Sequence, residues 1–391
     1  MTFAEFIAPF DAAVFRADHF GKRPLHVRAG GRGRPAFFDW ARFNEILAAT
    51  PYWTEESLKV FYRSRAALRE NYCDLTDLRP GAPAPVNPAK VKALLGLGAS
   101  LIANHVHRVS PAVAAVTGML EREFSARAFA NVYCSFQGVQ AFQTHFDLHD
   151  VFAVQIEGEK TWRVYESRAD TPVNPLPPGD EIENWLTASR GQLLFEAPMK
   201  PGDILYLPRG QYHDALTGAE ASLHVTFGVQ PATGLALLPL LEKTLIRESA
   251  FREYLPDARF ADQLRARMTR LAERVREVMT SPAFAVDVMN HQRDLALPAA
   301  DYGLPARPAT AWYSIARRAQ VVRRDAGYAI AYEGGEIPVG ANHPTLDWLL
   351  KQKLFSVADA LARHAGADPA ELRQDLERLE RAGVIVATEM R

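Results

Sequence analysis

Residues 143–152 read QTHFDLHDVF, and this stretch decides the fold and the site that we expect for the 391-residue chain. His145 and Asp147 are two positions apart, and side chains at that spacing on a β-strand point to the same face. An imidazole and a carboxylate on one face can bind the same metal ion when a third ligand comes from another strand. His149 would lie about 13 Å further along an extended strand than His145. We therefore expect His149 outside the metal site, at the surface or in a substrate channel.

The third ligand is expected from residues 201–213, which read PGDILYLPRGQYH. We favour His213, because Gly210 allows a turn at the mouth of a barrel and His213 would start the next strand. His224, on another expected strand, is the competing candidate. Two imidazoles and one carboxylate leave three coordination positions open, as in non-haem iron(II) centres, although manganese and zinc accept the same ligands.

The residues around both segments have the pattern of an antiparallel β-domain. From about residue 128 to 231, short β-branched and aromatic runs alternate with turns that contain glycine and proline. This pattern predicts an antiparallel barrel or a double-sheet jelly roll. Strands are expected at Ala130–Phe136, Val151–Ile156, Thr161–Tyr165, Gly191–Glu196, Asp203–Leu207 and Ser222–Val229. The segment Glu166–Arg190 contains four prolines, and we expect it to be a long loop or insert.

A co-substrate with a carboxylate would need a cation in the cavity, and two residues are candidates. Lys160 follows the turn Glu157-Gly158-Glu159. If the flanking strands pair as a hairpin, Lys160 starts the returning strand and can point into the barrel. Most lysines are exposed, so spacing alone favours a surface position for Lys160. Arg163, on the same expected strand, is the alternative.

The parts outside this β-region are predicted to be mixed or helical. Apolar residues at helical spacing indicate helices at Phe3–Phe15, Trp40–Ala48 and Pro111–Phe124. The same spacing recurs from residue 233 to about 289. The apolar stripe that it creates must be buried, either on the barrel or against a second copy of the chain.

The C-terminal residues 311–391 combine short strand and helix patterns that are typical of a winged-helix-like unit. Strands are expected at Gln320–Arg323, Gly327–Tyr332, Ile337–Val339 and Val384–Val386, and helices at Thr345–Leu350, Val357–His364 and Asp368–Ala382. Asp368 is a good cap, Pro369 suits the first turn, and Gly383 suits the helix end. From residue 345 to 391 there are seven Lys and Arg against eight Asp and Glu. This balance argues against a phosphate-binding face, so we expect no DNA binding.

The composition indicates a folded globular protein of more than one domain. Hydrophobic residues make up 48% and charged residues 23%, and the net charge of −1 gives no general attraction to nucleic acid or acidic membrane. The two cysteines, Cys73 and Cys134, suit a reducing cytosol. No signal peptide pattern and no apolar stretch near 18 residues is present in the sequence. We therefore expect a soluble, cytoplasmic protein.

At these motifs the chain resembles the JmjC-type ribosomal oxygenases. The likeness lies in His145-Phe146-Asp147 with Asp150-Val151-Phe152, in Pro201-Gly202-Asp203 with Leu205-Tyr206-Leu207-Pro208, Gly210 and His213, and in Ser222-Leu223-His224-Val225-Thr226. The resemblance implies an α+β protein with a double-stranded β-helix core of the jelly-roll or cupin type. It also implies an order of parts: mixed α/β support (1–95), JmjC core (96–232), helical dimerisation segment (233–310) and winged-helix-like domain (311–391).

The resemblance further implies a cofactor site. Iron(II) would be held by His145, Asp147 and His213, with 2-oxoglutarate and dioxygen as co-substrates. Lys160 would bind the distal carboxylate of 2-oxoglutarate. The other residues expected to line the site are Tyr133, Thr226, Asn131 and His224, the first two as hydroxyl donors.

The implied activity is hydroxylation of a histidine or arginine side chain in a protein substrate, in the family a ribosomal protein, by a homodimeric enzyme. Two alternatives stay open. One is a related oxygenase that acts on another peptide or removes an N-methyl group. The other is a non-catalytic regulator whose jelly roll senses a metabolite. The sequence leaves the target residue and the role of residues 166–190 open.

Overall fold

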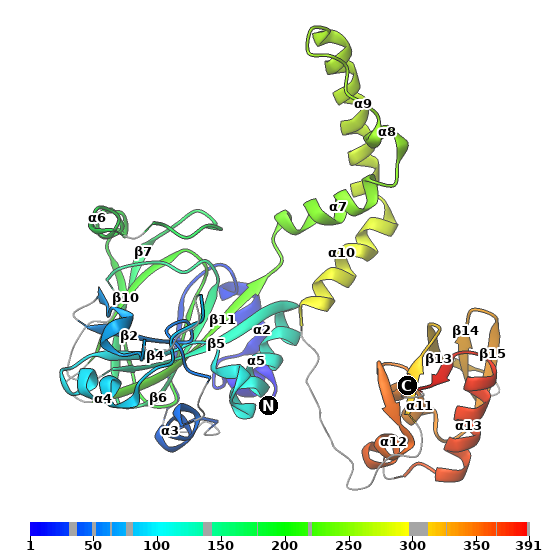
Figure 1. Cartoon of the computed structure of the whole chain (residues 1–391), viewed down its shortest axis with the longest axis horizontal. Helices are drawn as coiled ribbons and strands as arrows, with labels where there is room; N and C mark the ends of the chain where they lie inside the picture. The colour runs from blue at the N-terminus through cyan, green and yellow to red at the C-terminus, as the bar shows by residue number, and fades with distance from the viewer. Residues whose placement is uncertain are drawn as a thin grey trace. The chain divides into compact units, whose positions relative to one another are not determined.

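Figure 1 shows the computed structural model of the chain. It describes residues 1–30, 37–48, 52–62, 65–75, 81–135, 143–177, 179–217, 221–296, 312–325, 327–364 and 366–388. These residues form two compact units, Met1–Ala299 and Ala300–Arg391. The finer division into four parts stays a prediction.

Two antiparallel sheets form the centre of the first unit. The larger sheet has the strand order β1-β9-β6-β11-β5-β4-β2-β3, and the smaller sheet has the order β10-β7-β8. The strands of the larger sheet are β1 (Leu25–Val27), β2 (Leu58–Tyr62), β3 (Arg65–Ala66), β4 (Ser100–Ala103), β5 (Ala126–Ser135), β6 (Asp150–Glu157), β9 (Ile204–Leu207) and β11 (Ser222–Pro231). Those of the smaller sheet are β7 (Lys160–Arg168), β8 (Leu193–Met199) and β10 (Gln211–Thr217). This arrangement agrees with the predicted double-sheet jelly roll.

The larger sheet is covered on both faces, and its central strand β6 has buried apolar residues on both. On β6, Phe152 and Val154 pack into the main core with the helices α1 (Phe3–Ile7) and α5 (Pro111–Phe124). Val151 and Ala153 pack instead with residues of the smaller sheet. Because successive side chains of a strand alternate between faces, the residues of β5 and β11 that point away from the main core lie together. They are polar and line a pocket: Asn131, Tyr133, His224 and Thr226.

The first predicted helix, Phe3–Phe15, is wrong in its extent. The structure divides it into α1, α2 (Ala12–Val14) and a π-helical turn at Phe15–His19. Pro9 lacks a backbone N–H and cannot continue α1. Asp11 then caps a new helix, since its carboxylate accepts from the backbone N–H groups of Ala13 and Val14. The helices expected at Trp40–Ala48 and Pro111–Phe124 are confirmed as α3 (Trp40–Leu47) and α5.

The predicted hairpin around Gly158 is also wrong. Strand β6 pairs with β9 and β11 in the larger sheet, whereas β7 pairs with β8 and β10 in the smaller one. The turn at Gly158, with φ +64°, therefore carries the chain from one sheet to the other. A Cβ atom at Gly158 would lie 2.0 Å from the carbonyl oxygen of Ala221. This close approach requires glycine at the point where the two sheets meet.

The segment Glu166–Arg190, expected as a loop or insert, contains the helix α6 (Asp180–Ser189). Leu186 of this helix is buried against Tyr165 and Tyr212 of the smaller sheet. Three acidic residues lie in its first turn, where their negative charges interact favourably with the positive end of the helix dipole: Asp180, Glu181 and Glu183. The insert thus places a helix beside the smaller sheet.

The predicted helical region after the β-domain comprises α7 (Leu237–Leu245), α8 (Ser249–Arg252), α9 (Ala261–Met279) and α10 (Pro282–Leu295). Helices α7, α9 and α10 pack on one another around Leu241, Val278 and Phe284, and α10 also contacts β5. Among the described residues, no helix combines the length and the apolar character that crossing a membrane requires.

The second unit contains two three-stranded sheets and three helices around its own core. The sheets have the orders β16-β12-β17 and β13-β14-β15. The elements are β12 (Trp312–Ile315), β13 (Ala319–Arg324), β14 (Gly327–Tyr332), β15 (Gly335–Val339), α11 (His343–Leu349), β16 (Leu354–Ser356), α12 (Val357–Arg363), α13 (Pro369–Arg381) and β17 (Ile385–Ala387). The predicted caps of α13 are confirmed: the Asp368 carboxylate accepts from the backbone N–H of Ala370, and Gly383 has φ +67°. Its assignment as winged-helix-like stays a prediction.

Candidate active site

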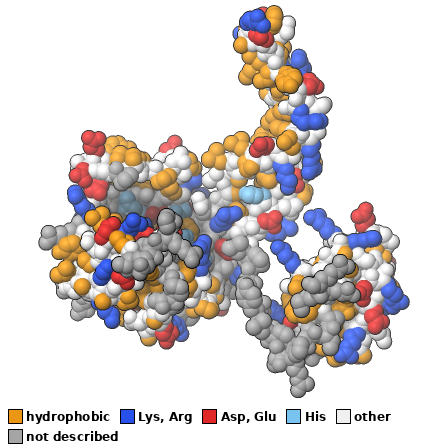
Figure 2. Space-filling view, viewed as in Figure 1, with side chains coloured by type: hydrophobic (Ala, Val, Ile, Leu, Met, Phe, Trp, Pro, Cys, Tyr) orange, Lys and Arg blue, Asp and Glu red, His pale blue; other side chains and the backbone are white. Residues whose placement is uncertain are grey.

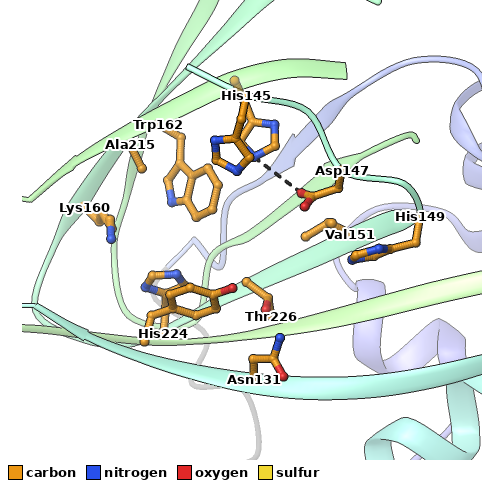
Figure 3. A pocket seen from close by; sticks show the side chains of 12 residues that line it. Asn131, His145, Asp147, His149, Val151, Lys160, Trp162, Ala215, His224 and Thr226 are labelled. Carbon is orange, nitrogen blue, oxygen red and sulfur yellow. Dashed lines mark ion pairs between the residues drawn. The ribbon is translucent and has the colours of Figure 1, made fainter. Parts of the chain in front are cut away.

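Three side chains from two separate segments of the chain converge in the first unit. The potential ligand atoms of His145, Asp147 and His213 all lie within 4.8 Å of one another. His213 Nε2 lies 3.6 Å from Asp147 Oδ2, and Figure 3 draws this contact as a dashed line. The sequence-predicted ligand set is therefore brought together, with geometry suited to a single ion.

Main-chain hydrogen bonds fix the two histidines relative to each other. The His145 N–H donates to the His213 carbonyl at 3.0 Å, and the His213 N–H donates to the His145 carbonyl at 2.9 Å. Residues that exchange both backbone hydrogen bonds are direct neighbours across an antiparallel pair, with side chains on one face. The two rings lie 4.4 Å apart between centroids.

Each ring is also oriented through its other nitrogen. His145 Nδ1 lies 2.9 Å from the carbonyl oxygen of Gln143, and His213 Nδ1 lies 2.9 Å from that of Gln211. A carbonyl can only accept, so each Nδ1 carries the proton and each Nε2 is the unprotonated nitrogen, the one that can ligate a metal. A ligating histidine in a metal site is held in this way.

The local conformation differs from the predicted strand. Residues 143–149 form an irregular segment in which His145 makes one isolated bridge, and β6 begins only at Asp150. His149 lines the pocket and packs edge-on against the ring of Phe129, 4.8 Å between centroids. It is outside the His-Asp-His cluster. The expectation that His149 lies apart from the metal ligands in a channel thus agrees with the structure, although the extended strand assumed for it does not.

The protonation states suit cation binding. Burial raises the pKa of the Asp147 carboxyl, but the imidazoles of His213, His149 and His145 outweigh burial, and the net shift is downward. Burial, with a smaller effect of His145, lowers the pKa of His213 to about 4. Near neutral pH the site therefore presents an ionised carboxylate and a neutral imidazole, which are the forms that bind metals.

The cluster opens into a cavity of about 240 Å³ between the two sheets. Figure 3 shows Asp147 and His149 on one side of this cavity and Lys160 and His224 on the other. Lys160, the first residue of β7, is only 5% exposed. Burial lowers its pKa to about 8. A surface position for Lys160 is thereby excluded, and the residue reaches the cavity although the hairpin that suggested it is absent.

The other predicted cofactor residues also line this cavity. Tyr133 makes side-chain hydrogen bonds with Thr226 and Asn131. The ring of His224 stacks on that of Tyr133, 4.8 Å between centroids and 7° between planes. His224, the competing metal ligand, is not in the three-residue cluster. Arg163, the competing cation, binds the Asp214 carboxylate through Nε at 2.7 Å and does not line the cavity.

Two buried polar atoms in the cavity wall have no partner among the described residues. They are the indole Nε1 of Trp162 and the Nδ1 of His224. Leaving buried polar atoms unpaired costs about 1–3 kcal/mol each. Together with the Lys160 ammonium and the hydroxyls of Tyr133 and Thr226, they offer a polar site at the opposite side from the metal ligands. This donor set fits a small ligand that has one end on the metal and a carboxylate at the other.

Sequence reasoning missed two features of this site. Trp162 was not considered as a site residue, yet its ring lies 5.7 Å from that of His213 and stands between the metal ligands and Lys160. Asp214, directly after His213, was not singled out at all. A buried aspartate flanked by strand residues is a signal that could have pointed to it, since aspartates are almost never fully buried without partners.

The two sheets with a His-Asp-His cluster between them define a jelly-roll protein with a candidate metal centre. Comparisons with known proteins agree. The family model of the JmjC domain matches residues 105–237. Residues 105–237 are thus similar to a JmjC domain, and the resemblance of the chain to the JmjC-type ribosomal oxygenases is confirmed by its relatives.

Two relatives are similar to this chain in sequence. Ribosomal oxygenase 1 of Gallus gallus is 29% identical over 294 residues, which cover 70% of this chain and 46% of that protein. Bifunctional lysine-specific demethylase and histidyl-hydroxylase NO66 of Drosophila willistoni is 30% identical over 201 residues, which cover 47% of this chain and 25% of that protein. The chain thus spans less than half the length of these relatives.

The fold is that of a solved bacterial protein. The structure of YcfD, a ribosomal oxygenase from Escherichia coli, in complex with cobalt and 2-oxoglutarate, matches with a TM-score of 0.51. The match covers 97% of this chain and 99% of that chain at 18% sequence identity. At this identity the likeness concerns the fold.

Proposed function

We propose that the protein is an iron(II)- and 2-oxoglutarate-dependent oxygenase that hydroxylates a histidine or arginine side chain of a protein, in the first instance a ribosomal protein. The observation that carries the proposal is the His145-Asp147-His213 cluster in a cavity whose far side holds a buried lysine. The names of the relatives support the same class, since they include ribosomal oxygenase and histidyl-hydroxylase.

His145, Asp147 and His213 would hold the iron through two Nε2 atoms and one carboxylate oxygen. Iron bound there would supply the oxidative chemistry in which one atom of dioxygen enters the substrate and the other enters succinate, formed with carbon dioxide from 2-oxoglutarate. Three ligands leave room for a bidentate co-substrate and for dioxygen. The choice of iron over manganese or zinc follows from these open positions.

The protein's own part is to bind, orient and exclude water. Lys160 would bind the distal carboxylate of 2-oxoglutarate, because a desolvated ammonium beside a carboxylate is a strong contact. The hydroxyls of Tyr133 and Thr226 would donate to the same carboxylate. Asn131 already bonds the backbone N–H of His105 at 3.0 Å and Tyr133 through its side chain, so it holds Tyr133 in place. His224 would complete the wall through the stacked Tyr133 ring.

A protein substrate would enter over the metal ligands. A second hollow, of about 380 Å³, shares His145, Asp147 and His149 with the first cavity. Its remaining walls are apolar and come partly from the insert: Phe146, Leu148, Pro175, Leu176 and Leu186. A side chain reaching the metal through this hollow would be shielded from water, which supports a macromolecular substrate rather than a free metabolite.

We also propose a homodimer formed through the helical segment. Several of its apolar side chains are more than half exposed, and Figure 2 shows apolar side chains along this segment. They include Leu238, Ile246, Leu255, Phe260 and Met268. An unusual number of exposed large apolar side chains on one segment favours an interaction site there. A Leu238→Glu, Met268→Glu double variant should sediment at half the mass of the unaltered protein.

The cytoplasmic location and the absence of DNA binding stay predictions.

The catalytic proposal is tested by binding and turnover in sequence. Iron(II) and 2-oxoglutarate are titrated without oxygen, oxygen is then admitted, and succinate is measured against an Asp147→Ala control. The proposed enzyme forms succinate and the control does not. Equal succinate in both proteins would leave the metabolite-sensing regulator as the better reading.

The competing oxygenase reading is separated by mass spectrometry of ribosomal proteins and methylated peptides after turnover. Hydroxylation adds one oxygen atom to the substrate, whereas demethylation removes one methylene. The name of the Drosophila willistoni relative includes both activities. Loss of methylene without gain of oxygen would favour the demethylase.

A further inference from the structure

A buried carboxylate lies directly behind the candidate metal ligands. Asp214 follows His213 on β10, and its side chain is 1% exposed. Thr144 precedes His145 and is also buried. Because His145 and His213 are directly paired, Thr144 and Asp214 are the next pair, with side chains on the opposite face from the ligands. The Thr144 hydroxyl donates to Asp214 Oδ2 at 2.9 Å.

Two further groups donate to this carboxylate from β7. The Tyr165 hydroxyl donates to Oδ2 at 2.7 Å, and Arg163 Nε donates to Oδ1 at 2.7 Å. Both oxygens of Asp214 are therefore occupied by short hydrogen bonds. A carboxylate with this many partners has one fixed orientation, and it ties both ligand-bearing segments to the strand beside them.

Arg190 connects the same group to the insert. It lies directly after α6, and its Nη1 donates to the Thr144 hydroxyl oxygen at 2.9 Å. The same Nη1 is 3.7 Å from Asp214 Oδ2, and the guanidinium lies 4.3 Å above the ring of Tyr165. Thr144 thus accepts from Arg190 and donates to Asp214, which makes one continuous chain of hydrogen bonds. This chain runs from the end of α6 to the back of the metal site.

We propose that Asp214, Thr144 and Arg190 are positioning residues that hold His145 and His213 in metal-binding geometry and couple this geometry to the insert at 166–190. The inference rests on the proposed metal site and adds a function for the insert. Leu186 of α6 walls the hollow over the metal ligands, so a substrate pressing on the insert would act on the same chain.

The physical argument concerns rigidity. Metal affinity depends on ligands already held near their bound positions, and loss of an orienting outer partner typically costs about 10- to 100-fold in affinity. The imidazole rings are themselves oriented by the carbonyls of Gln143, directly before Thr144, and of Gln211, three positions before Asp214. Release of the Thr144–Asp214 bond would free the segment that carries the Gln143 carbonyl and the His145 ring together.

The decisive experiment measures the affinity of the full chain for cobalt(II). Binding is detected by visible absorption and compared among four variants. Thr144→Val removes the hydroxyl at nearly constant volume, and Asp214→Asn removes the charge. Both should bind cobalt(II) about 10- to 100-fold more weakly than the unaltered protein. Thr144→Ser, which keeps the hydroxyl, should bind as the unaltered protein does. Thr187→Val is the matched control, since it removes a hydroxyl on α6 that, among the residues the structure describes, bonds the carbonyl of Glu183 in its own helix.

A second readout tests the coupling itself. Coupling between two sites is reciprocal, so metal binding should slow amide hydrogen exchange in Asp180–Ser189 of the unaltered protein. The effect should be absent in Arg190→Gln. A role of Arg190 in general stability alone would change exchange with and without metal equally.

The outcomes separate the inference from the function on which it rests. Unaltered cobalt(II) affinity in a folded Thr144→Val protein would overturn the inference and leave the oxygenase proposal intact. Metal-independent exchange in α6 of the unaltered protein would overturn the coupling. Failure of the unaltered protein to bind cobalt(II) at all would overturn both. If Asp214→Asn does not fold, the comparison of Thr144→Val with Thr144→Ser tests the inference.

Discussion

His145 and His213 exchange two backbone hydrogen bonds, of 3.0 and 2.9 Å, although they lie far apart in the sequence. The main chain, and not the rotamers alone, therefore sets the distance between the two imidazoles. Asp147 joins them through the backbone as well, since its carbonyl accepts the N–H of Gly210 at 2.9 Å. The metal-binding geometry is thus a property of how the irregular segment 143–149 is joined to the turn before β10.

Gly210→Ala should disturb this junction. Gly210 has φ +84°, and a Cβ atom would lie 2.5 Å from the carbonyl oxygen of Ala169. Strain of this kind costs on the order of 1–3 kcal/mol, so we expect that loss in the free energy of unfolding by urea, with weaker cobalt(II) binding. Gly96→Ala is the control, because nothing lies within 4 Å of a Cβ atom there. Equal stability of the two variants would contradict the strain argument.

Lys160→Met should weaken 2-oxoglutarate binding and leave metal binding unchanged. Hydrogen bonds to charged groups are worth about 1.5–3 kcal/mol, which corresponds to a loss of roughly 10- to 150-fold in affinity. Anaerobic titration of the metal-loaded protein measures it. Lys200→Met serves as control, since Lys200 is exposed on the β8–β9 turn and pairs only with Glu159 at 3.5 Å. An unchanged 2-oxoglutarate affinity would remove Lys160 from the proposed site.

The affinity for 2-oxoglutarate should depend on pH through the same lysine. Burial lowers the pKa of Lys160 to about 8 in the free protein, and a bound carboxylate raises it again. Below pH 8 the ammonium is charged in both states, so affinity is constant. Above pH 8 binding must take up a proton, and affinity falls about tenfold per pH unit until the pKa of the complex is reached. Lys160→Met should show no such decline between pH 7 and 9.

Gly228→Ala should displace His149 from the mouth of the cavity. A Cβ atom at Gly228 would lie 2.4 Å from the Cζ atom of Phe129 and 2.7 Å from the Cδ2 atom of His149, whose rings pack on each other. We expect slower modification of the protein substrate, with substrate-free succinate formation largely retained, since His149 lies outside the ligand cluster. His149→Ala should reproduce the substrate effect without the steric strain. If it modifies substrate as the unaltered protein does, His149 is not part of the entry path.

Local patterns predicted those elements whose signals are contained in a few residues. The helix at Pro111–Phe124 is bounded by Ser110 as cap and Pro111 at its first position, and the structure gives the same bounds. Short apolar strands between glycine and proline turns were located within a few residues. Helix α6 was missed because four prolines dominate the segment before it and little of its surface is buried, so its hydrophobic pattern is weak.

Pairings between strands that are distant in sequence could not be predicted from local patterns. Because β6 and β7 are adjacent in sequence, a hairpin was considered, yet they belong to different sheets. The two edges of β6 are hydrogen-bonded to β9 and β11, which leaves no edge for β7. Lys160 reaches the cavity through this crossing between sheets. Its burial therefore depends on a nonlocal arrangement that neighbouring residues do not encode in any simple spacing.

The amino-acid sequence by itself determined the ligand types, the His-x-Asp spacing, the strand-rich region and the family likeness, because these depend on residue chemistry and local periodicity. Tertiary structure decided that His213 and not His224 joins the cluster, that Lys160 and not Arg163 faces the cavity, and that Asp214 lies behind the ligands. The reason is that strand pairing assigns each side chain to a face, and a shift of one residue would exchange the cavity side for the outer side.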